Sequence, residues 1–212
     1  MKSLAQQIEE LKENLVKQLP TEVLEVFDKS IQDLKTKNIE ESSIKVNDKF
    51  PDFSLPGAGN KIINLMERLK DGKVIVAFFR GSWCPYCNLE LKALQDCLKQ
   101  ITDRKITLIA ISPQTPDYSE ELKNRHHLEF ELLSDKDNFL AKQLGISFEL
   151  QDDVVPVYAR LGIALSDYNE NHNNELPVPA IFVIDTDRTI TYKFADTNYM
   201  NRVDIQELIG QL

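Results

Sequence analysis

Apolar residues recur every three or four positions through residues 1–41, a stretch that contains no glycine. This spacing predicts two amphipathic helices separated at Pro20, and Ser3 with Gln6 can form a capping box at the start of the first. The two stripes consist of Leu4, Ile8, Leu11 and Leu15, and then of Val23, Leu24, Phe27, Ile31 and Leu34. Because a helical hairpin cannot bury both stripes by itself, we expect an N-terminal extension that either covers the main domain or forms a homodimer contact.

From residue 44 the pattern changes to short apolar runs that alternate with stretches of helical spacing. Residues 73–79 and 106–111 are rich in β-branched residues, as is typical of strands buried on both faces. Further strands are expected over 50–55 at a sheet edge, over 130–133, and over 180–184 with 189–194 as a hairpin. Helices are expected after Asn64, over 89–101, 117–127 and 138–144, and from Val203. The alternation predicts an α/β domain over residues 44–212, with a mixed central sheet flanked by helices.

Residues 147–177 follow neither the helical nor the strand period. They contain six acidic residues and one arginine, and residues 169–175 are rich in asparagine. A long unpatterned segment within a compact domain is usually a functional or flexible loop. We expect an acidic insertion loop on the surface, helical around residues 157–165, with Tyr158 and Tyr168 exposed to solvent.

The charge balance narrows the range of partners. The chain of 212 residues has 25 basic and 34 acidic residues, a net charge of −9, which argues against a nucleic acid or an anionic membrane. The longest purely apolar run, residues 74–79, is far shorter than the ~20 residues that cross a bilayer. No signal-peptide pattern opens the sequence, and we therefore expect a cytoplasmic protein.

The strongest chemical signal is the sequence Cys84-Pro85-Tyr86-Cys87, between the predicted strand at 73–79 and the helix that follows. Unpaired N–H groups and the helix dipole favour an anion at a helix start, so a thiol there is more readily ionised than free cysteine. Pro85 suits the first helical position, where its missing N–H costs nothing. The two-residue spacing also allows the thiols to close into a disulfide. This arrangement favours thiol redox chemistry.

Two other interpretations of the cysteines fit the sequence less well. A Cys-x-x-Cys pair can form half of a zinc site, but a structural site needs four ligands, and none of His126, His127, His172 and Cys97 has ligand spacing to a partner. Two inert core cysteines would not explain the motif at a strand–helix junction. We expect neither a metal ion nor a cofactor, and we expect Cys97 to be a core residue, since it keeps step with Leu94 and Ile101.

Several segments in order resemble the alkyl hydroperoxide reductase/thiol-specific antioxidant family, the peroxiredoxins. These are residues 48–55 (Asp-Lys-Phe-Pro-Asp-Phe-Ser-Leu), 109–112, 133–146 and 182–185, so that the resemblance spans about residues 44–210. It implies a thioredoxin-like fold and reduction of hydroperoxides by a cysteine thiolate at a helix start. It also places Cys87 at the position of the attacking cysteine, with Cys84 where the family has Thr or Ser.

The chain departs from the family in ways that bear on its chemistry. Pro179 replaces the arginine expected before the strand at 180–184, and that arginine normally lowers the pKa of the attacking cysteine. Arg80 replaces the family's proline and is the candidate for the missing cation, with Arg202 as a weaker candidate. Trp83 with the Cys-x-x-Cys pair resembles thioredoxin, and Val178–Pro179 lies where thioredoxin-fold proteins have a cis-proline that faces the thiols.

Three functions therefore stay open from the sequence. In the first, a peroxidase uses Cys87 to attack and Cys84 to resolve, and a thioredoxin-like thiol returns the electrons. In the second, a protein-disulfide oxidoreductase uses Cys84 as its nucleophile, and Trp83 and Pro179 shape the substrate groove. In the third, a non-catalytic redox sensor binds a partner through residues 147–177.

Overall fold

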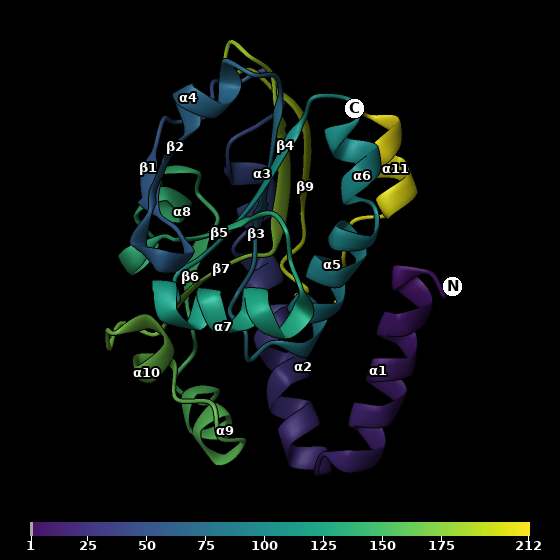
Figure 1. The fold of residues 1–212 in the computed structure, drawn as a ribbon. Coiled ribbons are helices and arrows are strands. Elements are labelled where there is room, and N and C mark those ends of the chain that lie inside the picture. The colour runs from purple at the N-terminus through teal and green to yellow at the C-terminus, as the bar shows by residue number, and fades with distance from the viewer. Residues whose placement is uncertain (1) are drawn as a thin grey trace.

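The computed structural model describes residues 2–212 and has a five-stranded sheet at its centre (Figure 1). The strand order is β5 (Glu131–Ser134), β4 (Thr107–Ser112), β3 (Val74–Phe78), β8 (Ala180–Ile184) and β9 (Ile190–Ala195). β3, β4 and β5 run parallel to one another, and β8 is antiparallel to both of its neighbours, β3 and β9. This mixed sheet, with the predicted 180–195 hairpin at one edge, confirms the α/β thioredoxin-like fold expected from the sequence.

The two faces of the sheet bury separate clusters of side chains, because successive residues of a strand point to opposite faces. Ile75 and Ala77 of β3 point toward α5 (Pro85–Asp96), α6 (Leu98–Thr102) and α11 (Ile205–Gly210). Val76 and Phe78 point to the other face, toward α4 (Leu65–Leu69) and α8 (Phe139–Gln143). α7 (Pro116–His126) follows β4. Among residues 2–212, none of the helices has the length and apolar character that a membrane span requires.

The N-terminal segment forms α1 (Leu4–Gln18) and α2 (Thr21–Thr36), followed by the short α3 (Ile39–Ser42). The capping box of Ser3 and Gln6 is present, and Pro20 separates the two long helices as predicted. Leu4 and Ile8 pack with the residues of α5, whereas Leu34 and Ile39 join the core on the opposite face of the sheet. The stripes of the extension thus pack on the sheet domain at both of its faces. That residues 1–41 and 44–212 are separate units stays a prediction.

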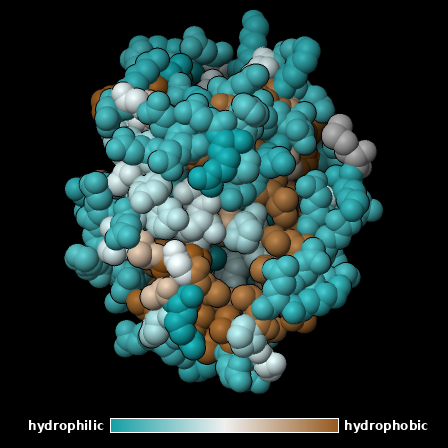
Figure 2. All heavy atoms as spheres, turned by 60° about the horizontal axis from the view of Figure 1, so that its bottom comes forward, coloured by the Kyte–Doolittle hydropathy of each residue, from teal (hydrophilic) through white to brown (hydrophobic). Residues whose placement is uncertain are grey.

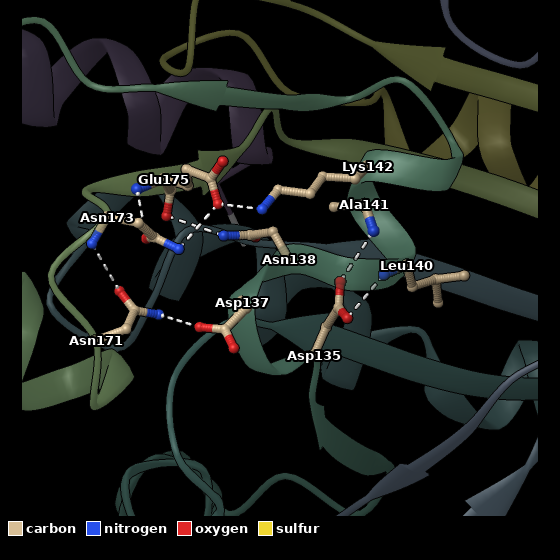
Figure 3. A network of polar contacts seen from close by, with 9 residues as sticks. All are labelled: Asp135, Asp137, Asn138, Leu140, Ala141, Lys142, Asn171, Asn173 and Glu175. Atoms are coloured by element: carbon tan, nitrogen blue, oxygen red, sulfur yellow. Dashed lines mark hydrogen bonds and ion pairs between the residues drawn. The ribbon is translucent and has the colours of Figure 1, made fainter.

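Residues 147–177 are more ordered than the expected surface loop. β6 (Ser147–Glu149) and β7 (Glu175–Pro177) pair with each other, and α9 (Val155–Arg160) and α10 (Leu165–Asn169) lie between them. Polar contacts fix this segment to the 3-10 turn Lys136–Asn138, where Asn171 donates to Asp137 and Asn138 donates to the Glu175 carbonyl (Figure 3). In place of the one helical stretch expected around residues 157–165, the segment contains two short helices, α9 and α10, between the paired strands β6 and β7.

The edge strand expected over residues 50–55 is shorter than predicted. β1 (Ser54–Pro56) pairs only with β2 (Ile62–Asn64), and the turn between them contains the 3-10 helix Ala58–Asn60. Phe50 and Phe53 are buried in the core instead, where Phe50 packs edge-on against Phe182 at 5.4 Å between ring centroids. Burial of the two aromatic rings outweighs the extended pairing that the alternating sequence suggested.

Candidate active site

The Cys-x-x-Cys motif lies at the start of α5, directly after the central strand β3. Cys84 is the N-cap of α5, Pro85 occupies the first helical position, and Cys87 lies in the first turn, as predicted. Both thiols are buried, with 1% and 0% of Cys84 and Cys87 exposed. The helix start therefore offers its positive end to sulfur atoms that solvent hardly reaches, which strengthens its effect on them.

The loop between β3 and α5 is held from two sides. The Ser82 N–H donates to the buried side chain of Gln114 at 2.8 Å, and the Asn88 side chain donates to the Ser82 carbonyl at 3.0 Å. Gly81 has a positive φ of 153°, and a Cβ there would lie 2.3 Å from Nε1 of Trp83. The indole of Trp83 thus lies against the backbone at Gly81, a position that only glycine allows.

Arg202 is the cation in direct contact with the dithiol. Its Nη2 donates to Cys87 Sγ at 3.3 Å and to the Tyr199 carbonyl at 2.7 Å, and its Nη1 pairs with the Glu90 carboxylate at 2.6 Å. Glu90 comes one turn after Cys87 on the buried face of α5, and burial raises the pKa of its carboxyl while Arg202 opposes that shift. The side chains of the Glu90–Arg202 pair are buried, and the ion pair holds the guanidinium in contact with Cys87 Sγ.

Arg80 is a second buried cation and is enclosed by aromatic rings. Its guanidinium carbon lies 4.1 Å from the ring centroid of Tyr199 and 5.0 Å from that of Trp83, and its Nη2 donates to the hydroxyl of Tyr158. Only 2% of Arg80 is exposed, and among the salt bridges of residues 2–212 none involves it. A buried cation without a carboxylate partner is costly unless another negative charge is near. The thiolate of the dithiol can supply that charge.

The surroundings of the two cysteines shift the pKa values of their thiols in opposite directions. Burial alone would raise the pKa of Cys84, but a hydrogen bond from Cys87 and the charges of Arg80 and Arg202 outweigh it and lower that pKa to about 6. Burial, together with the hydrogen bond to Cys84 and its charge, raises the pKa of Cys87 well above its usual range. Burial and both arginines act in the same direction on the two sulfurs, so it is the hydrogen bond from Cys87 to Cys84, with the charge that it supports, that favours the thiolate on Cys84.

A cavity of about 410 Å³ opens onto Cys84 and not onto Cys87. Arg80, Trp83, Tyr86 and Tyr199 form its wall at the sulfur, while the far wall comes from the N-terminal helices and from α9. A reactant that enters the cavity therefore meets Cys84 first.

The structure brings together most of the residues predicted from the sequence, and corrects several expectations. Cys84, Cys87, Arg80 and Trp83 share the site, whereas Pro179 is buried before β8, outside the cavity lining, and every peptide bond in residues 2–212 is trans. The trans form is the lower-energy isomer and fits the extended chain that leads from β7 into β8. Cys97 is a core residue, as predicted, and its thiol donates to the Leu94 carbonyl at 3.3 Å.

Three functional positions were missed or underrated from the sequence. Tyr158 was expected at the surface but is 4% exposed, because its ring packs edge-on against Trp83 and Phe27. Arg202 was ranked below Arg80 but is the cation that touches sulfur. Glu90 had a usable signal, since it is a charged residue three positions after Cys87 on the same apolar face of a helix.

The sequence is similar to those of known thiol-dependent proteins of one family. Residues 46–193 match the AhpC/TSA family. The chain belongs to that family. Peroxiredoxin Bcp of Escherichia coli strain K12 is 25% identical over 162 residues, which is 76% of this chain and 92% of that protein. A Coxiella burnetii protein named as a bcp peroxiredoxin is 33% identical over 104 residues, 49% of this chain and 68% of that protein.

Solved structures show the same fold. The crystal structure of peroxidoxin BcpB from Mycobacterium tuberculosis aligns with a TM-score of 0.62 and 20% identity, covering 79% of this chain and 96% of that one. The protein is thus a thiol-based oxidoreductase of the peroxiredoxin family with a thioredoxin-like fold. The matched segment, 46–193, includes Cys84 and Cys87 but neither the N-terminal helices nor Arg202.

Proposed function

We propose that this peroxiredoxin reduces hydroperoxides with Cys84 as the attacking thiolate and Cys87 as the resolving thiol. The observation that carries the assignment is that the cavity of about 410 Å³ is lined by Cys84, the cysteine with the lowered pKa, and not by Cys87. This reverses the roles that alignment with the family gave to the two cysteines. A cysteine with a pKa near 6 is mostly ionised at pH 7, and the thiolate is the form that attacks.

In the first step the Cys84 thiolate attacks one oxygen of the hydroperoxide, and the O–O bond breaks as the new S–O bond forms. Sulfur loses two electrons and becomes a sulfenic acid, and the departing alkoxide takes up a proton to leave as an alcohol. Arg80 and Arg202 stabilise the negative charge as it moves from sulfur to oxygen. Arg80 Nε is buried and has no acceptor within residues 2–212. This free N–H at the cavity wall can therefore donate to the oxygen on which the negative charge develops.

In the second step Cys87 attacks the sulfenic sulfur of Cys84, so that a disulfide forms and water leaves. The two cysteines are one turn apart at the start of α5, which allows the ring to close within one chain. A thioredoxin-like dithiol donor then reduces the disulfide, and we propose the cytoplasm as the compartment that supplies it. A homodimer through the N-terminal helices stays a prediction.

The burial of Cys84 favours a peroxide over a protein disulfide as substrate. With 1% of the residue exposed, a small hydroperoxide can reach the sulfur through the cavity, whereas a disulfide on a folded protein cannot without movement of α1 or α9. Pro179, which was expected to shape a groove for a disulfide, does not line this cavity.

We expect the reduced protein to consume hydroperoxide continuously when dithiothreitol or a thioredoxin-like protein is present as donor, as followed by loss of peroxide. The Cys97→Ser variant is the matched control and should turn over like the wild type, because that thiol lies in the core away from the cavity. If the wild type consumes no peroxide but reduces insulin disulfides, the protein-disulfide oxidoreductase is the correct function.

A further inference from the structure

The N-terminal helices complete the cavity that leads to Cys84. Leu15 of α1, Leu19 directly after it, and Leu24 and Phe27 of α2 form one wall, and Leu161 and Ile163 after α9 form another. Figure 2 shows a hollow on this face of the molecule, framed by apolar side chains. The helices lie outside residues 46–193, the segment that matches the family, so this wall is an addition to the family domain.

The cavity is far larger than the reacting group of a hydroperoxide needs. At the ~30 Å³ that a water molecule occupies in the liquid, about 410 Å³ has room for roughly a dozen heavy atoms, whereas hydrogen peroxide has two. A cavity of this size with apolar walls favours an apolar ligand, since removal of apolar surface from water is favourable.

The chemical groups are distributed unevenly around the cavity. Arg80 and Cys84 lie at one end, while aromatic and aliphatic side chains line the rest, apart from Lys12 and Asp28. Asp28 is exposed, and Lys12 has a weak ion pair with Glu9 at 3.6 Å. A ligand that fits must place its polar, reactive end at Cys84 and an apolar body against α1 and α2.

The wall formed by the two helices is held in place on the domain. Lys29 pairs with Asp153 at 2.9 Å, and Ser30 donates to Gln151 at 2.8 Å, so that α2 is fastened to the segment before α9. Phe27 packs edge-on against Tyr158, whose hydroxyl receives the hydrogen bond from Arg80. The apolar wall and the cation at the reacting sulfur are therefore parts of one connected structure.

We propose that α1 and α2 form a binding site for the hydrocarbon body of the substrate, which makes the enzyme select bulky apolar hydroperoxides over hydrogen peroxide. This inference rests on the proposed peroxidase function. It assigns to Leu15, Leu19, Leu24 and Phe27 the role of specificity-determining residues, which touch the substrate's body and not its reacting oxygens.

The test compares second-order rate constants for cumene hydroperoxide and hydrogen peroxide in the wild type, in Leu24→Trp and in Glu25→Trp. Leu24 lines the cavity and the larger indole fills it, whereas Glu25 is the next residue on the exposed face of α2. We expect the wild type to prefer cumene hydroperoxide. Leu24→Trp should lower the ratio of the rate constant for cumene hydroperoxide to that for hydrogen peroxide about tenfold, which is a typical effect of changing the volume of an apolar pocket. Glu25→Trp should leave the ratio unchanged.

A binding measurement that needs no catalysis separates this inference from the proposed function. Trp83 is the only tryptophan and lines the cavity, so its fluorescence reports on occupancy of the site. We expect cumyl alcohol, the unreactive product, to change the fluorescence of the wild type in a saturable way, and the same titration of Leu24→Asn to require a several-fold higher concentration. Peroxide turnover with no preference, an unchanged ratio in Leu24→Trp, or no saturable binding would overturn the proposal. Binding without any peroxide turnover would instead contradict the proposed function.

Discussion

The Cys84→Ser variant is expected to lose peroxide reduction by at least about a thousandfold, because Cys84 is the one thiol among residues 2–212 that lines the cavity. The Cys87→Ser variant should behave differently. It retains the thiolate at Cys84 and a hydroxyl that can donate to it, so that in the absence of a small thiol such as dithiothreitol it should consume one equivalent of peroxide and then stop as a sulfenic acid. Both variants therefore lose turnover, but only Cys87→Ser should react once.

The first equivalent is best measured by stopped-flow mixing with a small excess of hydroperoxide, followed by trapping of the sulfenic acid with dimedone and mass spectrometry. The wild type should show loss of two hydrogens, as expected for the Cys84–Cys87 disulfide, and no dimedone adduct. An adduct on Cys87 in the Cys84→Ser variant, at a rate near that of the wild type, would show that the roles are the reverse and that the family alignment assigned them correctly.

The Arg202→Met variant is expected to be destabilised by ~3–5 kcal/mol at neutral pH, because it leaves the Glu90 carboxylate buried without its partner. A carboxyl whose folded pKa lies above its unfolded value stabilises the folded state at low pH and loses that contribution as the pH rises through the folded pKa. Burial already raises the pKa of Glu90, and loss of the guanidinium raises it further, so the variant should lose less stability at mildly acidic pH than at pH 7.

Urea unfolding at both pH values measures this difference, and the Arg202→Met/Glu90→Gln double variant is its control. With a neutral amide at position 90, stability should recover largely, whereas the rate of peroxide reduction should stay low because the cation beneath Cys87 is still missing. A double variant that is no more stable than Arg202→Met would contradict the pairing. One that reduces peroxide like the wild type would show that Arg202 serves only to hold Glu90.

The features that sequence reasoning predicted correctly are local in the chain. The Ser3–Gln6 capping box, Asn64 at the start of α4 and the β8–β9 hairpin depend on residues within a few positions of one another. The position of Cys84 and Cys87 at a helix start follows in the same way, since the apolar run of β3 leads directly into Pro85.

What could not be predicted depends on contacts between distant segments. Arg202 reaches Cys87 across 115 positions, and Arg80 reaches Tyr158 across 78. Tyr158 lies in a segment without periodicity, where the sequence carries no sign that a core aromatic ring packs on Phe27. The acidity of the two thiols depends on their burial, on the hydrogen bond between them and on both arginines, and the cavity at Cys84 depends on distant segments. The family alignment contains none of these contacts, and it pointed to Cys87.

The assignment of the thiolate to Cys84 is tested most directly by the pH dependence of alkylation, with each cysteine identified by peptide mass. Brief labelling of the reduced wild type with iodoacetamide between about pH 4 and about pH 9 measures the thiolate fraction of each residue. We predict that Cys84 is labelled first, with a midpoint about pH 6 and little reaction below it, and that Cys87 and Cys97 stay unlabelled over this range. Labelling of Cys87 with the low midpoint, or of Cys84 only above pH 8, would contradict the assignment.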